Sequence, residues 1–167
     1  MSILEQLSSA LGRRDEIPNQ ELAKRIADSK DKKAILELIE NLDNKKKDIQ
    51  QDCIKVLYEI GAIDPKLIAE YHDEFAALLE SKNNRMQWGG MTALNSITLQ
   101  KPEIIMTNLH RLIEVAEAGS VITKDNLMGI LTKLISLPAY SKQAFPLLNE
   151  QLKKCPSNQL PMYAENM

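Results

Sequence analysis

An apolar pattern recurs along this chain at a spacing of 37 residues, and this repeat restricts the possible folds more than any other feature of the sequence. Seven apolar or proline positions in residues 42–68 are matched 37 positions later: Leu42, Ile49, Ile54, Leu57, Ile60, Pro65 and Ile68 pair with Leu79, Met86, Met91, Leu94, Ile97, Pro102 and Ile105. A second step of 37 reaches Thr123, Met128, Leu131 and Leu134, after which the offset falls to 36. Repeats of this length are typical of stacked supersecondary units.

Each repeat is predicted to be a helix, a turn marked by proline, and a second helix. Apolar residues recur with the 3.6-residue period of a helix, and no stretch alternates as a half-buried strand would. A lone helix pair cannot bury its apolar faces, so neighbouring pairs must stack. We therefore expect one all-α domain over residues 1–167, a right-handed α-solenoid of about three helix pairs. Its expected parts are a helical but irregular N-terminal cap (1–42), repeats over 45–80, 82–118 and 120–155, and the start of a further helix over 157–167.

Composition narrows the class of protein. The 167 residues are 44% hydrophobic but only 4% aromatic, so the core must come from aliphatic side chains and methionine. The formal net charge of −2 argues against a dedicated nucleic-acid binder, which needs a basic field. Two cysteines are too few for a disulfide scaffold. We find no signal-peptide pattern and no apolar run that could span a membrane, so we expect a cytoplasmic protein with no membrane partner.

The repeat resembles the HEAT family over about residues 45–155. The first helix of each unit shows the pattern of that family, which is Met86-Gln87, Gly90, Ala93-Leu94 and Ile97 in repeat two, Ile49-Gln50, Cys53, Val56-Leu57 and Ile60 in repeat one, and Thr123-Lys124, Leu127, Ile130-Leu131 and Leu134 in repeat three. Of the family's usual basic positions, only Lys124 is basic. Armadillo repeats, which add a third helix, are the neighbouring alternative. The resemblance implies a scaffold or regulatory adaptor.

No pattern of residues indicates catalysis, a cofactor or a metal. His72 and His110 lie almost one repeat apart, and Cys53 and Cys155 are too distant in sequence for any short ligand spacing. Cys53 falls on an apolar stripe and is expected to be a buried small hydrophobe. Gly89-Gly90 lies within a predicted helix, where close packing explains Gly90 but gives no reason for Gly89.

Trp88 is the most informative single residue of the predicted surface. It lies far from the apolar stripe of its helix, and the other repeats place Gln51 and Asp125 at this position. An indole there is either an exposed anchor for a partner or a filler between repeats. We predict a partner-binding surface around it and on the second helix of the same repeat, formed by Asn84, Arg85, Gln87, Trp88, Thr107, His110 and Arg111.

These observations favour a non-catalytic module that binds a protein or peptide, with no nucleic acid, cofactor or metal. Two alternatives stay open. The apolar end around Phe145, Leu148 and Leu152 is expected to be poorly capped, which would suit a structural subunit that associates with itself through its C-terminal repeat. Some HEAT-like proteins are DNA glycosylases, and Trp88 with Arg85 and Asp125 is the one constellation here that such an activity could use.

Overall fold

A computed structural model describes residues 2–154, and that part of the chain is helical, with no strand. A short 3₁₀ turn, η1, covers Ile3–Gln6. The α-helices are α1 Ile17–Ser29, α2 Lys32–Glu40, α3 Lys47–Ile63, α4 His72–Ala77, α5 Asn84–Ser96, α6 Pro102–Thr107, α7 Leu109–Ala118, α8 Val121–Ile135 and α9 Ser141–Lys154. Three further 3₁₀ turns surround α4, namely η2 Pro65–Leu67, η3 Ala69–Tyr71 and η4 Leu78–Glu80.

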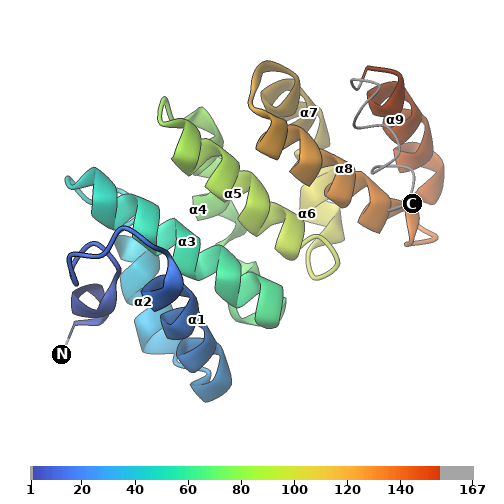
Figure 1. Ribbon diagram of the computed structural model, residues 1–167. Coiled ribbons are helices and arrows are strands. Elements are labelled where there is room, and N and C mark those ends of the chain that lie inside the picture. The colour runs from blue at the N-terminus through green and yellow to red at the C-terminus, as the bar shows by residue number, and fades with distance from the viewer. Residues whose placement is uncertain (1, 155–167) are drawn as a thin grey trace.

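The helices pack in a row, each against its neighbours (Figure 1). Helix α1 packs on α3, α3 on α5, and α5 on α8. Of the remaining helices, α2 packs on α3, α4 on α5, α6 on α7, and both α7 and α9 on α8. Helices α1 and α9 lie at opposite ends of the molecule.

The apolar positions that repeat in the sequence form the core. Leu57, Leu94 and Leu131 occupy the same position in successive units and are 0%, 3% and 0% exposed. Because equivalent side chains are buried in each unit, the period of 37 residues reflects the packing. Ile49, Pro65, Pro102 and Leu152 are only half-buried, and Phe145 is 48% exposed although its counterpart Leu109 is buried.

Local signals set the helix starts. The Asp31 carboxylate accepts a hydrogen bond from the backbone N–H of Ala34 at 3.0 Å and so caps α2, as expected of an aspartate at that position. Asn83 caps α5 and Ser120 caps α8 in the same manner. Pro18 and Pro102 lie in the first turns of α1 and α6, where the missing N–H costs nothing.

Two parts of the chain are less regular than the repeat predicts. The second half of the first unit consists of η2, η3, the short α4 and η4, and that of the second unit is divided into α6 and α7 at Asn108. The Asn108 side chain donates to the Ile104 carbonyl oxygen at 2.9 Å and so competes with the backbone hydrogen bonds of the helix. Residues 157–167, where a further helix was predicted, and Cys155 lie outside the described residues.

Candidate functional site

A network of ion pairs joins three helices on the side of the row that carries Lys55. This lysine lies within α3, and its side chain is only 8% exposed. Its Nζ contacts Glu16 Oε2 at 3.0 Å and Glu59 Oε1 at 2.6 Å. Arg85, in the first turn of α5, pairs with Glu16 Oε1 at 2.6 Å. Glu16 immediately precedes α1, so its carboxylate links α1, α3 and α5.

This network keeps the buried charge of Lys55 compensated. Burial disfavours the ammonium form, but the hydrogen bonds to Glu59 and Glu16 outweigh burial and raise the pKa of Lys55 above its ordinary value. A cation that is buried with two carboxylates fixes the relative positions of the groups that hold it. Breaking such a set is costly, because one charge is left without a partner.

Two aromatic side chains lie beside this network. Tyr58 on α3 and Trp88 on α5 have ring centroids 6.2 Å apart with planes inclined by 50°. The Lys55 Nζ lies 5.0 Å from the centroid of the Tyr58 ring, within the range of a cation–π contact. Both rings are half-buried. Trp88 therefore fills space between successive helices of the row while part of its surface stays accessible.

A cleft of about 450 Å³ opens next to Tyr58, and we call it the α3–α5–α8 cleft. Its lining comes from α3, the start of η2, α5 and α8, and consists of Tyr58, Glu59, Gly61, Ala62, Pro65, Thr92, Asn95, Ser96 and Lys133. A volume of this size is within the range of sites that hold small ligands or one or two side chains of a partner. The lining combines an aromatic ring, hydroxyl groups, an amide and charges of both signs.

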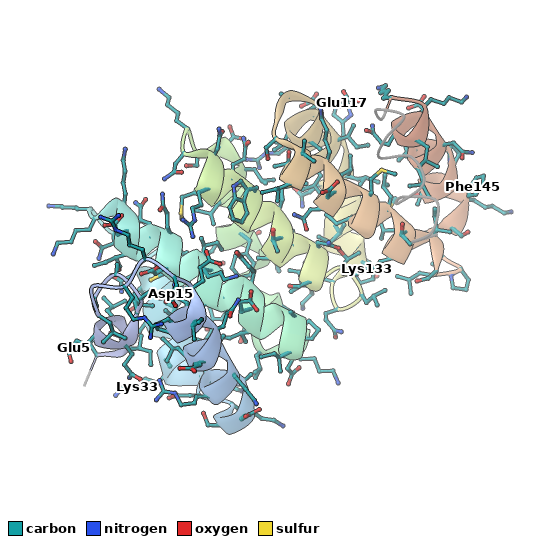
Figure 2. The ribbon with its side chains drawn as sticks, viewed as in Figure 1. Glu5, Asp15, Lys33, Glu117, Lys133 and Phe145 are labelled. Atoms are coloured by element: carbon teal, nitrogen blue, oxygen red, sulfur yellow. The ribbon has the colours of Figure 1, made fainter. Side chains whose placement is uncertain are left out.

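Hydrogen bonds between α5 and α8 form one side of this cleft. Asn95 Nδ2 donates to Asn126 Oδ1 at 3.0 Å, and Asn126 Nδ2 donates to Thr92 Oγ1 at 2.9 Å. Lys133 lies on the side of α8 that faces α5 (Figure 2) and donates to the backbone oxygen of Asn95 at 2.7 Å and to its Oδ1 at 2.9 Å. Burial lowers the pKa of the Lys133 ammonium group. No carboxylate of residues 2–154 lies within ion-pair distance of Lys133.

The partner-binding residues predicted on α5 do not all face the same way. Arg85 and Trp88 belong to the ionic and aromatic cluster described above. Gln87 points elsewhere, since its Nε2 donates to the Leu79 carbonyl oxygen at 3.1 Å and so ties α5 to η4. Asn84 is exposed in the first turn of the helix.

The predicted residues on the second helices form a separate group. Arg111 on α7 pairs with Glu80 and also donates to the Ala76 carbonyl oxygen at 3.4 Å. His110 Nε2 lies 3.0 Å from Glu114 Oε1, and the His110 side chain is 89% exposed. Thr107 is exposed at the end of α6. Whether these residues contact a partner stays a prediction; their contacts described here are with Ala76, Glu80 and Glu114, whereas Trp88 contacts Tyr58.

A second groove, of about 400 Å³, lies between α2 and α4, and we call it the α2–α4 groove. Its apolar lining is Ile39, Leu42, Ala77 and Leu78, and its charged lining is Glu40, Asp43 and Glu74. It is thus apolar and acidic. Hydrogen-bonded side chains of the kind that face the α3–α5–α8 cleft are absent from its lining residues.

Residues 2–154 offer few candidates for metal binding or for thiol chemistry. Over residues 2–154, no group of three or more His, Cys, Asp or Glu side chains could hold a metal ion. Cys53 is fully buried, as expected from its place on the apolar stripe, and burial raises the pKa of its thiol to about 12. No described helix is long and apolar enough to cross a membrane.

Comparison with known proteins adds no relative: no family model, no curated protein and no solved structure matches this chain.

The spacing of charged residues along α3 could have predicted the ionic network, although apolar periodicity alone does not. Asp52, Lys55 and Glu59 follow one another at intervals of three and four residues along α3, so they share a face next to the apolar stripe. A charged stripe beside a core stripe indicates polar contacts with the neighbouring repeat. Lys133 carried no such signal, because its only described partner is the distant residue Asn95.

Proposed function

We propose that this chain is a non-catalytic interaction module, a HEAT-like, right-handed α-solenoid, which binds a segment of a partner protein in the α3–α5–α8 cleft. The observation that carries the proposal is the composition of that cleft. Three successive helices of the row supply it, and it places an aromatic ring, amide and hydroxyl groups and a half-buried lysine around one open volume.

Several features support a peptide or protein segment as the ligand. Aromatic side chains that are part-buried and held in place by packing act as anchors at interfaces, and Tyr58 is held by Trp88 and Lys55. The Asn95 amide carries a second N–H beyond the one it donates to Asn126, and a peptide carbonyl oxygen would accept it. The ionic network behind Tyr58 keeps the wall of the cleft rigid, so little ordering is needed when a ligand binds.

The test is to fill the cleft without removing any side-chain contact. Ala62 is exposed and lines the cleft, so Ala62→Trp should obstruct it. Ala77 is also exposed but lines the α2–α4 groove, and Ala77→Trp is the matched control. Random peptides displayed on phage are selected on the wild-type chain, and the enriched peptides are measured by fluorescence polarisation against all three proteins.

We expect enriched peptides to bind the wild type and Ala77→Trp alike and to lose at least tenfold in affinity for Ala62→Trp. Peptides that instead lose affinity only for Ala77→Trp would move the site to the α2–α4 groove. Failure to enrich any peptide would contradict the interaction module itself. Circular dichroism and thermal unfolding establish that both variants keep the fold.

Self-association is a second candidate, favoured by one observation. Phe145 is 48% exposed on the outer side of α9, away from α8 (Figure 2). Leu148 and Leu152 face inward, since Leu148 is buried and Leu152 is packed against the core. Sedimentation velocity of the wild type and Phe145→Ser over a range of concentrations tests this candidate, which requires an oligomer that the variant loses.

The glycosylase-like alternative gains no support from the geometry. Trp88 packs on Tyr58, and Arg85 pairs with Glu16, so both are engaged in contacts within the protein.

The location of the protein in the cytoplasm stays a prediction from the sequence.

A further inference from the structure

The charge on Lys133 is compensated differently from the charges of its neighbours. Of the charged groups at the α3–α5–α8 cleft and in the ionic network behind it, Lys55 and Arg85 are paired with Glu16, and Lys55 also with Glu59. Among residues 2–154, Lys133 has only the two oxygens of Asn95 as partners, and both are neutral. Three cations thus face two carboxylates, and the positive charge in excess belongs to Lys133.

The position of Lys133 makes that excess charge available to a ligand. Its side chain is half-buried, and it lines the cleft. An ammonium group carries three donors, and Asn95 accepts two of them. The bonds to Asn95 also hold the ammonium group in a fixed place, so an incoming acceptor meets a donor that is already oriented.

We propose that Lys133 anchors a carboxylate of the bound protein segment, so that the cleft selects segments with an acidic side chain or a free C-terminus at this point. The inference rests on the function proposed above and adds the chemistry of the ligand. The carboxylate would accept the third donor of Lys133, while the rest of the segment contacts Tyr58 and the hydroxyl groups of α5.

The surroundings favour a carboxylate over a phosphate group. A single lysine offers one positive charge, and Glu59 lies in the same cleft, where it would repel a doubly charged group strongly. Phosphate sites usually combine arginine forks or several backbone N–H groups, and Arg85, the arginine of the neighbouring network, is already held by Glu16. One carboxylate against one lysine balances the charges.

Four short acetylated peptides, in two pairs, provide the probes. The first pair is acetyl-Ala-Glu-Ala-amide and acetyl-Ala-Gln-Ala-amide, which differ only in the side-chain charge. The second pair is acetyl-Ala-Ala-Ala with a free C-terminus and the same peptide as the amide. Each is titrated into the isotope-labelled chain of 167 residues, and the side-chain amide resonances of Asn95 and Asn126 report on the cleft by NMR.

We expect a carboxylate-bearing probe to shift the Asn95 amide resonances saturably and to bind about tenfold more tightly than its neutral partner, as a charge-assisted hydrogen bond would give. The two pairs distinguish an acidic side chain from a C-terminus. Lys133→Met should remove the preference for the carboxylate. Lys124→Met, at an exposed lysine on the same helix, should keep it.

A second variant is expected to strengthen the binding of a carboxylate, whereas Lys133→Met is expected to weaken it. Glu59→Gln removes a competing negative charge from the cleft while Lys55 keeps Glu16 as a partner. We expect this variant to bind the carboxylate probe several-fold more tightly. Damage to the fold would weaken binding, so a gain cannot arise from misfolding.

Two results would overturn the inference and are distinguishable from failure of the proposed function. If neutral and acidic probes bind the cleft equally, or if Lys133→Met keeps the preference, the cleft still binds peptides but Lys133 does not select a carboxylate. If no probe shifts any cleft resonance while the selected peptides bind elsewhere, both the inference and the cleft as a binding site are contradicted.

Discussion

The adjacent glycines Gly89 and Gly90 allow α5 to pack closely against two different helices, α3 and α4. A Cβ atom on Gly90 would lie 2.8 Å from the Phe75 carbonyl oxygen of α4, and one on Gly89 would lie 2.8 Å from Cγ1 of Ile54 on α3. Close packing was expected for Gly90, whereas apolar periodicity offered no reason for a glycine at position 89. The reason is tertiary: α5 is close to a different helix on each side.

Gly90→Ala should therefore destabilise the protein, although alanine is the better helix former by about 1 kcal/mol. The added methyl group meets the backbone of α4, which cannot move aside cheaply, and overpacking of this kind costs roughly 1–3 kcal/mol. Chemical denaturation measures the change. Asn84→Ala, at an exposed position of the same helix, is the control and should leave stability within about 0.5 kcal/mol of the wild type. A stabilised Gly90→Ala protein would show that α4 and α5 are not this close.

Cys53 should be an unreactive thiol in the folded chain. Burial first, and then the nearby charges of Asp52 and Glu37, raise its pKa to about 12 from an ordinary 9.0, so almost none is thiolate at pH 8. In a Cys155→Ser background, Ellman's reagent should react with Cys53 only slowly in buffer and rapidly in denaturant. Because the folded pKa lies above the unfolded one, ionisation of this thiol also lowers the stability of the fold as the pH rises from about 9 toward 12. Rapid labelling of the native protein at pH 8 would contradict the burial of this residue.

Polar contacts between elements give each helix of the row a defined neighbour. The segment before α1 is held by Asp52 of α3, which accepts hydrogen bonds from the Ser9 N–H at 2.8 Å and from Asn19 Nδ2 at 2.8 Å. Asn19 in turn accepts from the Ser8 N–H at 2.9 Å. Asp52 and Asn19 are both buried, so the N-terminal segment, α1 and α3 share one polar network inside the protein.

Asp52→Ala should destabilise this end of the molecule by about 2–4 kcal/mol, because it leaves the Ser9 N–H and the Asn19 amide without their acceptor. Asp48→Ala is a matched control one turn earlier on α3, at an exposed position, and should change stability little. Urea denaturation followed by circular dichroism gives both values. Equal effects of the two substitutions would mean that the buried network does not stabilise the fold.

The elements differ in how well the sequence predicts them. Helices α3, α5 and α8 could be predicted from apolar periodicity and the step of 37, because their buried side chains recur at helical spacing within each segment. The second helices of the first two units could not, because apolar periodicity does not indicate that the first is divided into η2, η3, α4 and η4, or that the second is interrupted at Asn108. The α3–α5–α8 cleft could not be predicted either: Tyr58, Asn95 and Lys133 come together only when three units stack. Of the residues predicted to bind a partner, Trp88 contacts Tyr58 of the cleft lining, and those on α6 and α7 do not line the cleft.

At the scale of the whole molecule, each helix of the row is stabilised mainly by its immediate neighbours. Helices α3 and α5 each pack on another helix of the row at both sides. Helix α9 packs chiefly on α8, with Gln151 and Lys154 bonded to Glu117 of α7. In such an array the free energy of unfolding is close to the sum of the intrinsic stabilities of the units and the stabilities of the interfaces between neighbours.

Amide hydrogen exchange should therefore form a gradient along the molecule. Opening α9 breaks one main interface, whereas opening α3 or α5 breaks two, so amides of α9 should exchange at least tenfold faster than those of α3 and α5. Mass spectrometry of exchanged peptides measures this. Leu148→Ala, which removes a buried contact of α9 with the core, should accelerate exchange in α9 and leave the protection of α3 nearly unchanged. If exchange rose equally in α3, the helices would open as one cooperative unit, and the description of the molecule as an array of neighbouring units would be wrong.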